Sequence, residues 1–138
     1  MSSTNKNITI FSDGGARGNP GPAGVGAVLY NEKKEKVAEV SKYLGVATNN
    51  QAEYKALIFA LEKANALGAE RIEAFLDSEL VVKQLNREYK VKNKDLAPLF
   101  LEVYNLSQKF KEIKFVHIPR EKNVEADRLA NLAMDRRA

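Results

Sequence analysis

The first part of the chain alternates apolar and polar residues with a period of two, which is typical of β-strands. Strands are expected at residues 8–13, 25–30 and 36–44. Between the first two, residues 14–24 contain five glycines and two prolines, so this segment is predicted to form a tightly turned loop. Because short connections between consecutive strands favour antiparallel pairing, we expect these strands to form an antiparallel unit.

From residue 50 the apolar residues recur at intervals of three and four, which predicts an amphipathic helix that ends at Gly68. Thr48 or Asn49 is expected to be its N-cap. The pattern then predicts a strand, two helices, a strand and a final helix, at residues 71–76, 78–86, 95–109, 113–118 and 123–136. A strand that follows a helical crossover is expected to pair in parallel. The order βββαβααβα predicts an α/β fold on a five-stranded mixed sheet.

The composition narrows the class of protein. Apolar residues make up 44% of the 138 residues and charged residues 29%, which excludes intrinsic disorder and suits one domain, 1–138. No apolar run approaches the roughly 18 residues of a membrane helix, and the first residues lack the apolar core of a signal peptide. With no cysteine and one histidine, His117, the sequence excludes disulfides, thiolate sites and multi-histidine zinc sites. We therefore expect a cytoplasmic, monomeric protein that uses carboxylates, amides, hydroxyls and basic groups.

Positive charge is concentrated in one segment. The whole chain carries a net charge of +4, and residues 83–94 alone carry the same excess, from five basic residues and one acid. A basic patch of this kind suits a polyanionic partner, and a solvated surface face is the alternative interpretation.

Two carboxylates are expected at the ends of strands. Asp13 follows Phe11 by two residues, and Asp77 follows Phe75 by two residues, so strand parity places each acid on the face of its phenylalanine. If the two strands are parallel neighbours, both acids emerge at one carboxyl edge, where ligand sites of α/β sheets tend to lie. The alternative for Asp77 is a helix N-cap.

Two further carboxylates are expected on the buried sides of helices. Glu53 lies on the apolar stripe of its helix, four residues before Leu57, and Asp127 lies three residues before Ala130. A buried carboxylate is costly unless it is paired or binds a metal, although Asp127 could instead stabilise a helix dipole. Four such acids without histidine or cysteine suit Mg²⁺ or Mn²⁺, and two such ions about 3.5–4 Å apart can catalyse phosphodiester cleavage.

The glycine-rich segment does not fit a nucleotide phosphate loop. It follows a strand, but it lacks the Lys-Ser/Thr pair and leads into another strand, so no helix N-terminus is offered to a phosphate. Glycines beside Asp13 would instead let a bulky substrate backbone approach closely.

Four motifs together resemble the signatures of type 1 ribonuclease H, in its short form without the long basic protrusion. They are DGGARGNPGP at residues 13–22, TNNQAE at 48–53, DS at 77–78 and NVEAD at 123–127. The resemblance implies a ribonuclease H-like fold and an endonuclease that cleaves the RNA strand of RNA–DNA hybrids, leaving 5′-phosphate and 3′-hydroxyl ends. It also implies two divalent ions at the acids: Glu53 and Asp77 at the water-side ion, Asp127 completing that site and Asp13 bridging both.

The same resemblance implies substrate contacts. Asn19, Asn49 and Asn50 would contact the minor groove of the hybrid, where 2′-hydroxyls distinguish RNA. Thr48 would contact a phosphate of the DNA strand. The backbone amides of Gly14, Gly15 and Ala16 would hold the RNA strand near the scissile bond. The asparagine side chains could also form turns and helix caps, and this structural role does not exclude contact with the substrate.

The chain departs from the family pattern at three places. It has no tryptophan and only residues 87–94 where relatives carry a long basic protrusion, so hybrid binding is expected to be weaker or more sensitive to salt. Glu79 stands where relatives often have glutamine, and it has no assigned role. The loop before the last helix lacks the usual histidine, so Arg120 is the preferred substitute, while His117 is interpreted as a packing residue in its strand.

The sequence leaves three alternatives to a hybrid-specific ribonuclease open. One is an enzyme that also cleaves double-stranded RNA, which presents 2′-hydroxyls in a similar groove. Another is a hybrid-binding module without catalysis, which the four intact acids disfavour. A transposase or integrase core shares the expected sheet and acids but normally lacks the first two motifs.

Overall fold

The computed structural model describes residues 5–137 and contains the elements predicted from the sequence, in the predicted order. Five strands, four α-helices and one 3₁₀ turn follow one another along these residues: β1 Asn7–Ala16, β2 Gly21–Tyr30, β3 Lys36–Ala47, α1 Asn49–Ala66, β4 Arg71–Leu76, α2 Glu79–Leu85, α3 Ala97–Ser107, β5 Glu112–His117, η1 Arg120–Lys122 and α4 Val124–Arg136. None of the described helices is long and apolar enough to span a membrane.

The strands form one mixed sheet in the order β3-β2-β1-β4-β5. Consecutive strands β1, β2 and β3 pair antiparallel, as short connections favour. Strand β4 returns through helix α1 and pairs parallel with β1, and β5 pairs parallel with β4. The predicted α/β fold with a five-stranded mixed sheet is therefore confirmed.

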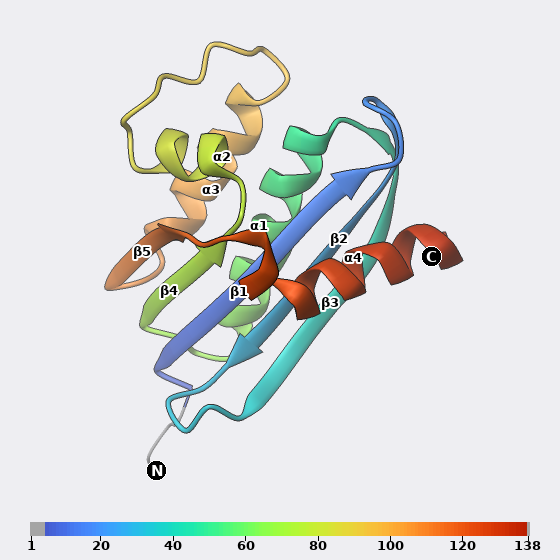
Figure 1. Ribbon diagram of the computed structural model, residues 1–138. Helices are drawn as coiled ribbons and strands as arrows, with labels where there is room; N and C mark the ends of the chain where they lie inside the picture. The colour runs from blue at the N-terminus through green and yellow to red at the C-terminus, as the bar shows by residue number, and fades with distance from the viewer. Residues whose placement is uncertain (1–4, 138) are drawn as a thin grey trace.

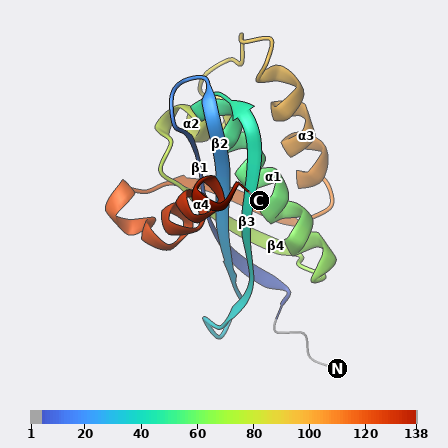
Figure 2. The same cartoon turned by 90° about the vertical axis from the view of Figure 1, so that its right-hand side faces the viewer.

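Helices cover the two faces of the sheet unequally (Figures 1 and 2). Helices α1, α2 and α3 lie on one face, where they bury the main hydrophobic core against β1 and β4. Helix α4 lies on the other face, across β2 and β3 and beside β1. Among the described residues, no α-helix lies over β4 and β5 on that second face (Figure 1).

Helix α1 begins and ends where the sequence predicted. The Thr48 side chain accepts a hydrogen bond from the backbone of Gln51, and the Gln51 side chain accepts one from the backbone of Thr48, which forms a capping box. The helix ends before Gly68, whose φ of +84° is the left-handed conformation that favours glycine after a helix.

The prediction for the glycine-rich segment was wrong. Residues 14–16 continue β1 and residues 21–24 begin β2, so only residues 17–20 form the connection. Some of these glycines serve close packing: a Cβ on Gly14 would lie 2.1 Å from the Ala52 carbonyl oxygen of α1, and one on Gly24 would lie 2.7 Å from the Ala130 carbonyl oxygen of α4. A Cβ on Gly26 would lie 2.1 Å from the Ala126 carbonyl oxygen of α4. Elsewhere the elements differ from prediction at their ends, most at β3, which continues to Ala47.

Candidate active site

The first two acids lie where the pairing between β1 and β4 stops. The last parallel pair joins Ser12 to Leu76, so Asp13 is the next residue along β1 and Asp77 is the first residue after β4. The rings of Phe11 and Phe75 stack with their centroids 5.1 Å apart, on the face that strand parity predicted for both acids. Asp13 does not end its strand, however, because β1 continues antiparallel to β2 up to Ala16.

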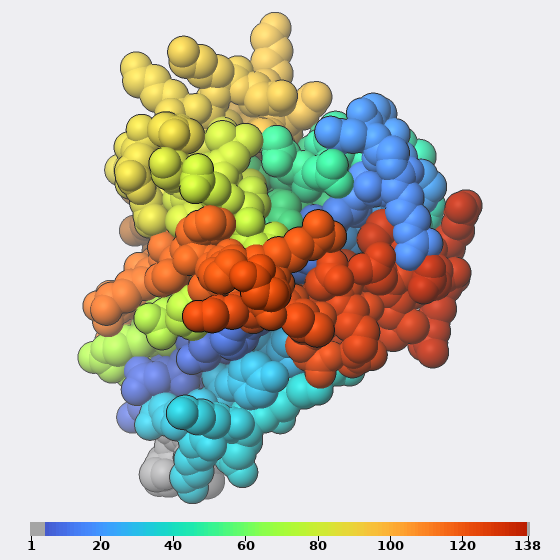
Figure 3. All heavy atoms as spheres, viewed as in Figure 1, coloured from blue at the N-terminus to red at the C-terminus, as the bar shows by residue number. Residues whose placement is uncertain are grey.

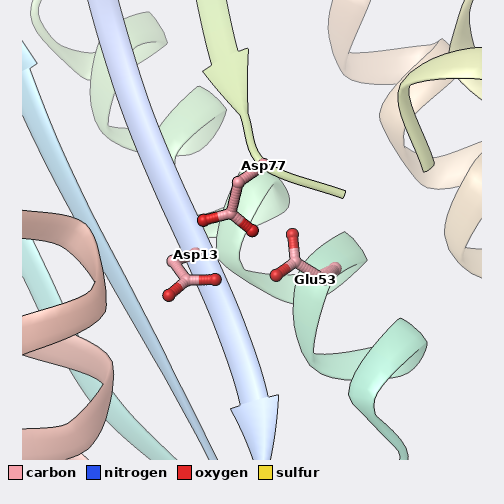
Figure 4. A group of neighbouring side chains, drawn as sticks. All are labelled: Asp13, Glu53 and Asp77. Carbon is pink, nitrogen blue, oxygen red and sulfur yellow. The ribbon is translucent and has the colours of Figure 1, made fainter. Parts of the chain in front are cut away.

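Glu53 reaches the same place from the opposite face of the sheet. Because β4 ends at Leu76, the edge of β1 beyond that point is open to the first turns of α1. The backbone N–H of Gly14 donates a hydrogen bond to Glu53 Oε1 over 3.1 Å. One oxygen from each of Asp13, Glu53 and Asp77 lies within 4.8 Å of the others, and Figure 4 shows the three side chains converging from β1, α1 and the end of β4.

The convergence of these acids is electrostatically unfavourable without a cation. Asp13 is 8% exposed and Glu53 is 5% exposed. Burial raises the pKa of Asp13 to about 7, and the nearby charge of Asp77 adds to the effect. Burial also raises the pKa of Glu53 well above its usual value, and a hydrogen bond with Asp13 contributes. The Glu53 Oε2 atom is buried and has no hydrogen-bond partner among the described residues.

Asp127 lies beside this group but outside it. It stands in the first turn of α4, lines the same cavity, and contributes through its charge and a hydrogen bond to the raised pKa of Asp13. Its side chain is 37% exposed, and one oxygen lies 3.9 Å from Arg120 Nη2. Its place in the first turn of α4 fits the helix-dipole interpretation, and its role as a metal ligand stays a prediction.

Asp77 is not a helix N-cap. Ser78 caps α2 instead, and its hydroxyl accepts a hydrogen bond from the backbone N–H of Val81 over 3.3 Å. The alternative that the sequence left open for Asp77 is thus excluded, and its carboxylate remains available at the cavity.

Asn123 is a site residue that the sequence did not assign. Its side chain is 1% exposed, and Nδ2 donates hydrogen bonds to the Ser12 carbonyl oxygen over 2.8 Å and to Asp77 Oδ2 over 2.9 Å. The backbone carbonyl oxygen of Asn123 accepts the N–H of Asp127 over 3.1 Å. This one residue therefore ties together the segments that carry three of the acids. Its neutral side-chain amide orients the Asp77 carboxylate and leaves the charge of that carboxylate in place, whereas an ammonium group would neutralise it.

The cavity at this edge has a volume of about 470 Å³. Its lining includes the four acids, Arg120 and five of the seven residues expected to contact substrate: Gly14, Gly15, Ala16, Asn49 and Asn50. Asn19 and Thr48 lie outside the lining. Arg17 and Asn131 line it as well, and the sequence had not singled them out.

Several of the expected substrate contacts are engaged within the protein. The N–H of Gly14 donates to Glu53, and the N–H of Ala16 donates to Asn49 Oδ1 over 2.8 Å. Asn19 Oδ1 in turn accepts the N–H of Asn49 over 3.1 Å. The asparagines thus hold the hairpin against α1, and Gly15 adds a stretch of backbone without side chain at the cavity wall.

His117 and Glu79, to which the sequence assigned no role at the site, both lie outside the cavity lining. His117 is exposed at the end of β5, so its interpretation as a packing residue was wrong. Glu79 is exposed in the first turn of α2, and its carboxylate lies 3.8 Å from Lys83 Nζ.

The chain is similar to ribonucleases H in sequence and in structure. A family model described as reverse transcriptase-like matches residues 11–133. Ribonuclease HI of Halobacterium salinarum is 46% identical over 128 residues, which cover 93% of this chain and 64% of the relative. A bifunctional protein of Mycobacterium tuberculosis is 46% identical over 129 residues, which cover 93% of this chain and 35% of the relative. The chain thus spans less than two thirds of the length of either relative.

A solved structure agrees closely with the fold described above. The crystal structure of LC11-RNase H1 in complex with an RNA/DNA hybrid is 46% identical to this chain and superposes with a TM-score of 0.90. The match covers 94% of this chain and 98% of that one.

Proposed function

The chain belongs to the ribonuclease HI family, and we propose that it is a metal-dependent endonuclease that hydrolyses the RNA strand of RNA–DNA hybrids. The observation that carries the proposal is the convergence of Asp13, Glu53 and Asp77 within 4.8 Å at the wall of an open cavity. Such a group costs free energy unless a cation binds there, and a cavity lined with backbone and asparagines suits a nucleic-acid strand.

The donor set fits a hard divalent cation. All the side-chain donors are carboxylate oxygens, and the buried Glu53 Oε2 has no partner among the described residues. We propose that Asp13, Glu53 and Asp77 hold one Mg²⁺ or Mn²⁺. The nearness of Asp127 to Asp13 supports a second ion held by those two residues, in place of the expected role of Asp127 beside Glu53 and Asp77.

The proposed reaction breaks the bond between phosphorus and the 3′ oxygen, while a water oxygen bonds to phosphorus. Bound divalent ions would supply positive charge that activates the water and stabilises the leaving oxygen. The residues of this chain position the acids and the substrate. Asn123 holds Asp77 in place through its hydrogen bond, and Gly15 lets the RNA backbone approach the acids. We propose that the chain acts as a monomer, because a single copy of it supplies all four acids of the site.

A gel assay with a labelled RNA–DNA duplex tests the proposal. Double-stranded RNA, double-stranded DNA and single strands serve as comparison substrates, each with Mg²⁺, Mn²⁺ or EDTA. We expect metal-dependent cutting of the RNA strand of the hybrid, and a loss of at least about 100-fold in the Asp77→Asn variant, because an amide removes a ligand charge. Mapping the product ends checks for 5′-phosphate and 3′-hydroxyl groups.

The other outcomes of this assay separate the alternatives. Cutting of double-stranded RNA as well would widen the substrate class and leave the mechanism in place. Tight hybrid binding with no cutting under either metal would contradict the proposal and favour a binding module.

Arg120 is proposed to assist turnover from the cavity rim. Its side chain is 83% exposed and 3.9 Å from Asp127, so it contributes little to packing and is free to hold a phosphate. We expect Arg120→Ala to slow turnover about tenfold, the size of one charge-assisted hydrogen bond, with an unchanged melting temperature. Steady-state kinetics and a thermal melt check this, and an unchanged rate would end the idea.

A further inference from the structure

Arg17 is a cation at the cavity wall that the proposed function has not used. It is the first residue after β1, and it shares the cavity lining with the four acids. Arg120 is the other cation in that lining, and it already lies beside Asp127. A polyanion that enters an acidic cavity needs a compensating positive charge, and on the α4 side Arg17 is the residue in position to supply it.

Within the described residues, the Arg17 guanidinium makes its hydrogen bonds and its ion pair through Nη2 alone. Nη2 lies 2.7 Å from Asp135 Oδ1, 3.3 Å from Asn131 Oδ1 and 3.5 Å from the Asn131 carbonyl oxygen. Nε and Nη1 make no hydrogen bond or ion pair with the rest of the described chain. Each edge of a guanidinium that can hold a phosphate with two donors includes Nη2, so a bidentate contact at Arg17 requires that the phosphate replace Asp135, and Nε then supplies the second donor.

The ion pair with Asp135 is one that a substrate can displace. The side chains of Arg17 and Asp135 are 47% and 63% exposed. Exposed pairs of this kind contribute about 0–1 kcal/mol, because water screens them and two flexible side chains must be ordered. Asp135 contacts the guanidinium through Nη2 alone, whereas a phosphate that takes its place can accept from Nη2 and Nε together, so it competes favourably with this carboxylate.

The backbone of Arg17 is held firmly while its side chain is half exposed. Its N–H donates to the Pro22 carbonyl oxygen over 2.8 Å, which closes the connection between β1 and β2. A Cβ on Gly21 would lie 2.2 Å from the Arg17 carbonyl oxygen, so the turn packs tightly around this residue. The guanidinium thus starts from a fixed point next to Ala16, which lines the cavity.

We propose that Arg17 binds a phosphate of the RNA strand beside the scissile bond, and that it exchanges Asp135 for that phosphate when the hybrid binds. This inference rests on the proposed function, because the strand that enters the acidic cavity is the one to be cut. Arg17 is then a substrate-binding residue, and Asp135 is the partner that holds its side chain at the cavity edge before binding.

The competing explanation is a purely structural clasp between the β1–β2 connection and helix α4. Two variants separate the explanations, because each removes one half of the ion pair. In a clasp, Arg17→Gln and Asp135→Asn have the same effect on stability and on binding. In a phosphate contact, Arg17→Gln weakens hybrid binding, whereas Asp135→Asn leaves binding unchanged or tightens it, since the competing carboxylate is gone.

The experiment measures hybrid affinity by fluorescence anisotropy in the presence of Mg²⁺, with Asp77→Asn as a common background that prevents cutting. Salt is varied from about 50 to 200 mM. We expect Arg17→Gln to weaken binding about fivefold to tenfold and to lower the slope of log affinity against log salt by about one. Arg128→Gln is the matched control, because Arg128 is an exposed α4 arginine paired with Glu125 outside the cavity lining.

A chemical substitution in the substrate identifies the strand. A hybrid whose DNA strand carries neutral methylphosphonate linkages should bind more weakly to every variant, yet the ratio between the parent protein and Arg17→Gln should persist. If that ratio falls to one, Arg17 contacts the DNA strand, and the assignment to the RNA strand is overturned.

The remaining outcomes are also decisive. Equal losses of affinity and of melting temperature in Arg17→Gln and Asp135→Asn would overturn the phosphate contact in favour of the clasp. So would an Arg17→Gln variant that matches Arg128→Gln in affinity and slope. A parent chain that neither cuts nor binds the hybrid would overturn the proposed function itself, and this result is distinguishable because it precedes any variant.

Discussion

Asp13 and Glu53 are two buried carboxylates that face each other without a basic partner in the cluster. In the absence of a cation, the folded protein holds a proton on this pair at a pH where the unfolded chain has released it. The site that is built to attract a metal is therefore a source of instability when the metal is absent, and the size of that instability depends on pH.

The raised pKa values of Asp13 and Glu53 determine whether the free energy of unfolding rises or falls with pH. Between the ordinary carboxyl range and about pH 7, the folded state binds more protons than the unfolded state, so the free energy of unfolding falls as pH rises. The shift of Asp13 from 3.8 to about 7 sets an upper limit of about 4 kcal/mol for this group. For Asp13 the loss continues through about pH 7 and is complete about one pH unit above it.

We predict that Asp13→Asn melts about 5 °C higher than the parent chain at pH 8 in EDTA, because the amide removes one of the buried charges. The difference should close at pH 5, and Mg²⁺ should raise the melting temperature of the parent but not of the variant. Calorimetry across this pH range measures both. Glu125→Gln is the control, since the exposed Glu125 has its pKa lowered by Arg128 and should show no gain at pH 8. Equal melting temperatures at pH 8 would contradict the prediction.

The positions of the acids could be predicted from local patterns, whereas their supporting residues could not. Asp13 and Asp77 follow from strand parity, and Glu53 follows from the apolar stripe of one helix. Asn123 lies just before α4 and resembles an ordinary cap, yet its side chain makes no cap hydrogen bond. It reaches residues 46 and 111 positions away in the chain, and such a contact exists only once the sheet and α4 have packed together.

At the scale of elements, the glycine-rich segment shows how local composition can mislead. Glycine and proline are the usual signals of a loop, and the sequence offers no direct sign that a helix will pack against these glycines. The structure uses Gly24 and Gly26 in β2 to bring α4 close to the sheet. That approach places Asp127 at the cavity, so the strand glycines are part of how the site is assembled.

We predict that Gly26→Ala strongly destabilises the fold, by several kcal/mol, because the new Cβ would meet the backbone of α4. It would lie 2.1 Å from the Ala126 carbonyl oxygen and 2.5 Å from the Ala130 nitrogen, and backbone atoms of a packed helix give way only if the whole helix moves. Denaturant unfolding measures the change in free energy.

Gly15→Ala is the matched control for stability, since its new Cβ would meet only Asn49 Oδ1 at an ordinary 3.9 Å. Its free energy of unfolding should lie within about 1 kcal/mol of that of the parent, because replacing a glycine inside a strand changes stability by no more than this when the new side chain meets no clash. Equal stability of Gly26→Ala and Gly15→Ala would contradict the prediction, because it would show that the close packing of α4 on Gly26 does not exclude a side chain.

At the scale of the whole molecule, negative and positive charge are separated. The acids lie inside the cavity, while the segment between α2 and α3 projects from the body and carries exposed lysines (Figures 1 and 3). Next to it, Lys83 lies over the ring of Tyr89 and Arg87 over the ring of Tyr104, 5.0 and 5.2 Å from the ring centroids. The predicted basic patch is thus a surface feature of the fold.

We predict that replacing Lys90, Lys92 and Lys94 together with glutamine weakens hybrid binding at least about tenfold at low salt. These lysines are exposed and have no ion pair among the described residues, so their charge is available to phosphates. The slope of log affinity against log salt should fall by roughly two to three, because each lost phosphate contact contributes about 0.9. The rate of cutting at saturating hybrid should stay unchanged, since none of the three lines the cavity.

The control for this triple variant removes the same charge from the other end of the molecule. Lys6, Lys33 and Lys34 precede β1 or lie in the β2–β3 turn, at the end of the sheet opposite the projecting segment (Figure 1). Their replacement with glutamine lowers the net charge by the same amount. The affinity of this control therefore measures how much the net charge of the whole molecule contributes to binding, an effect that salt screens beyond about 10 Å. Equal losses of affinity in the two triple variants would mean that net charge, and not the placement of the lysines, attracts the hybrid. A larger loss confined to the projecting segment would mean that this short loop serves as the hybrid-binding surface of a chain without a long basic protrusion.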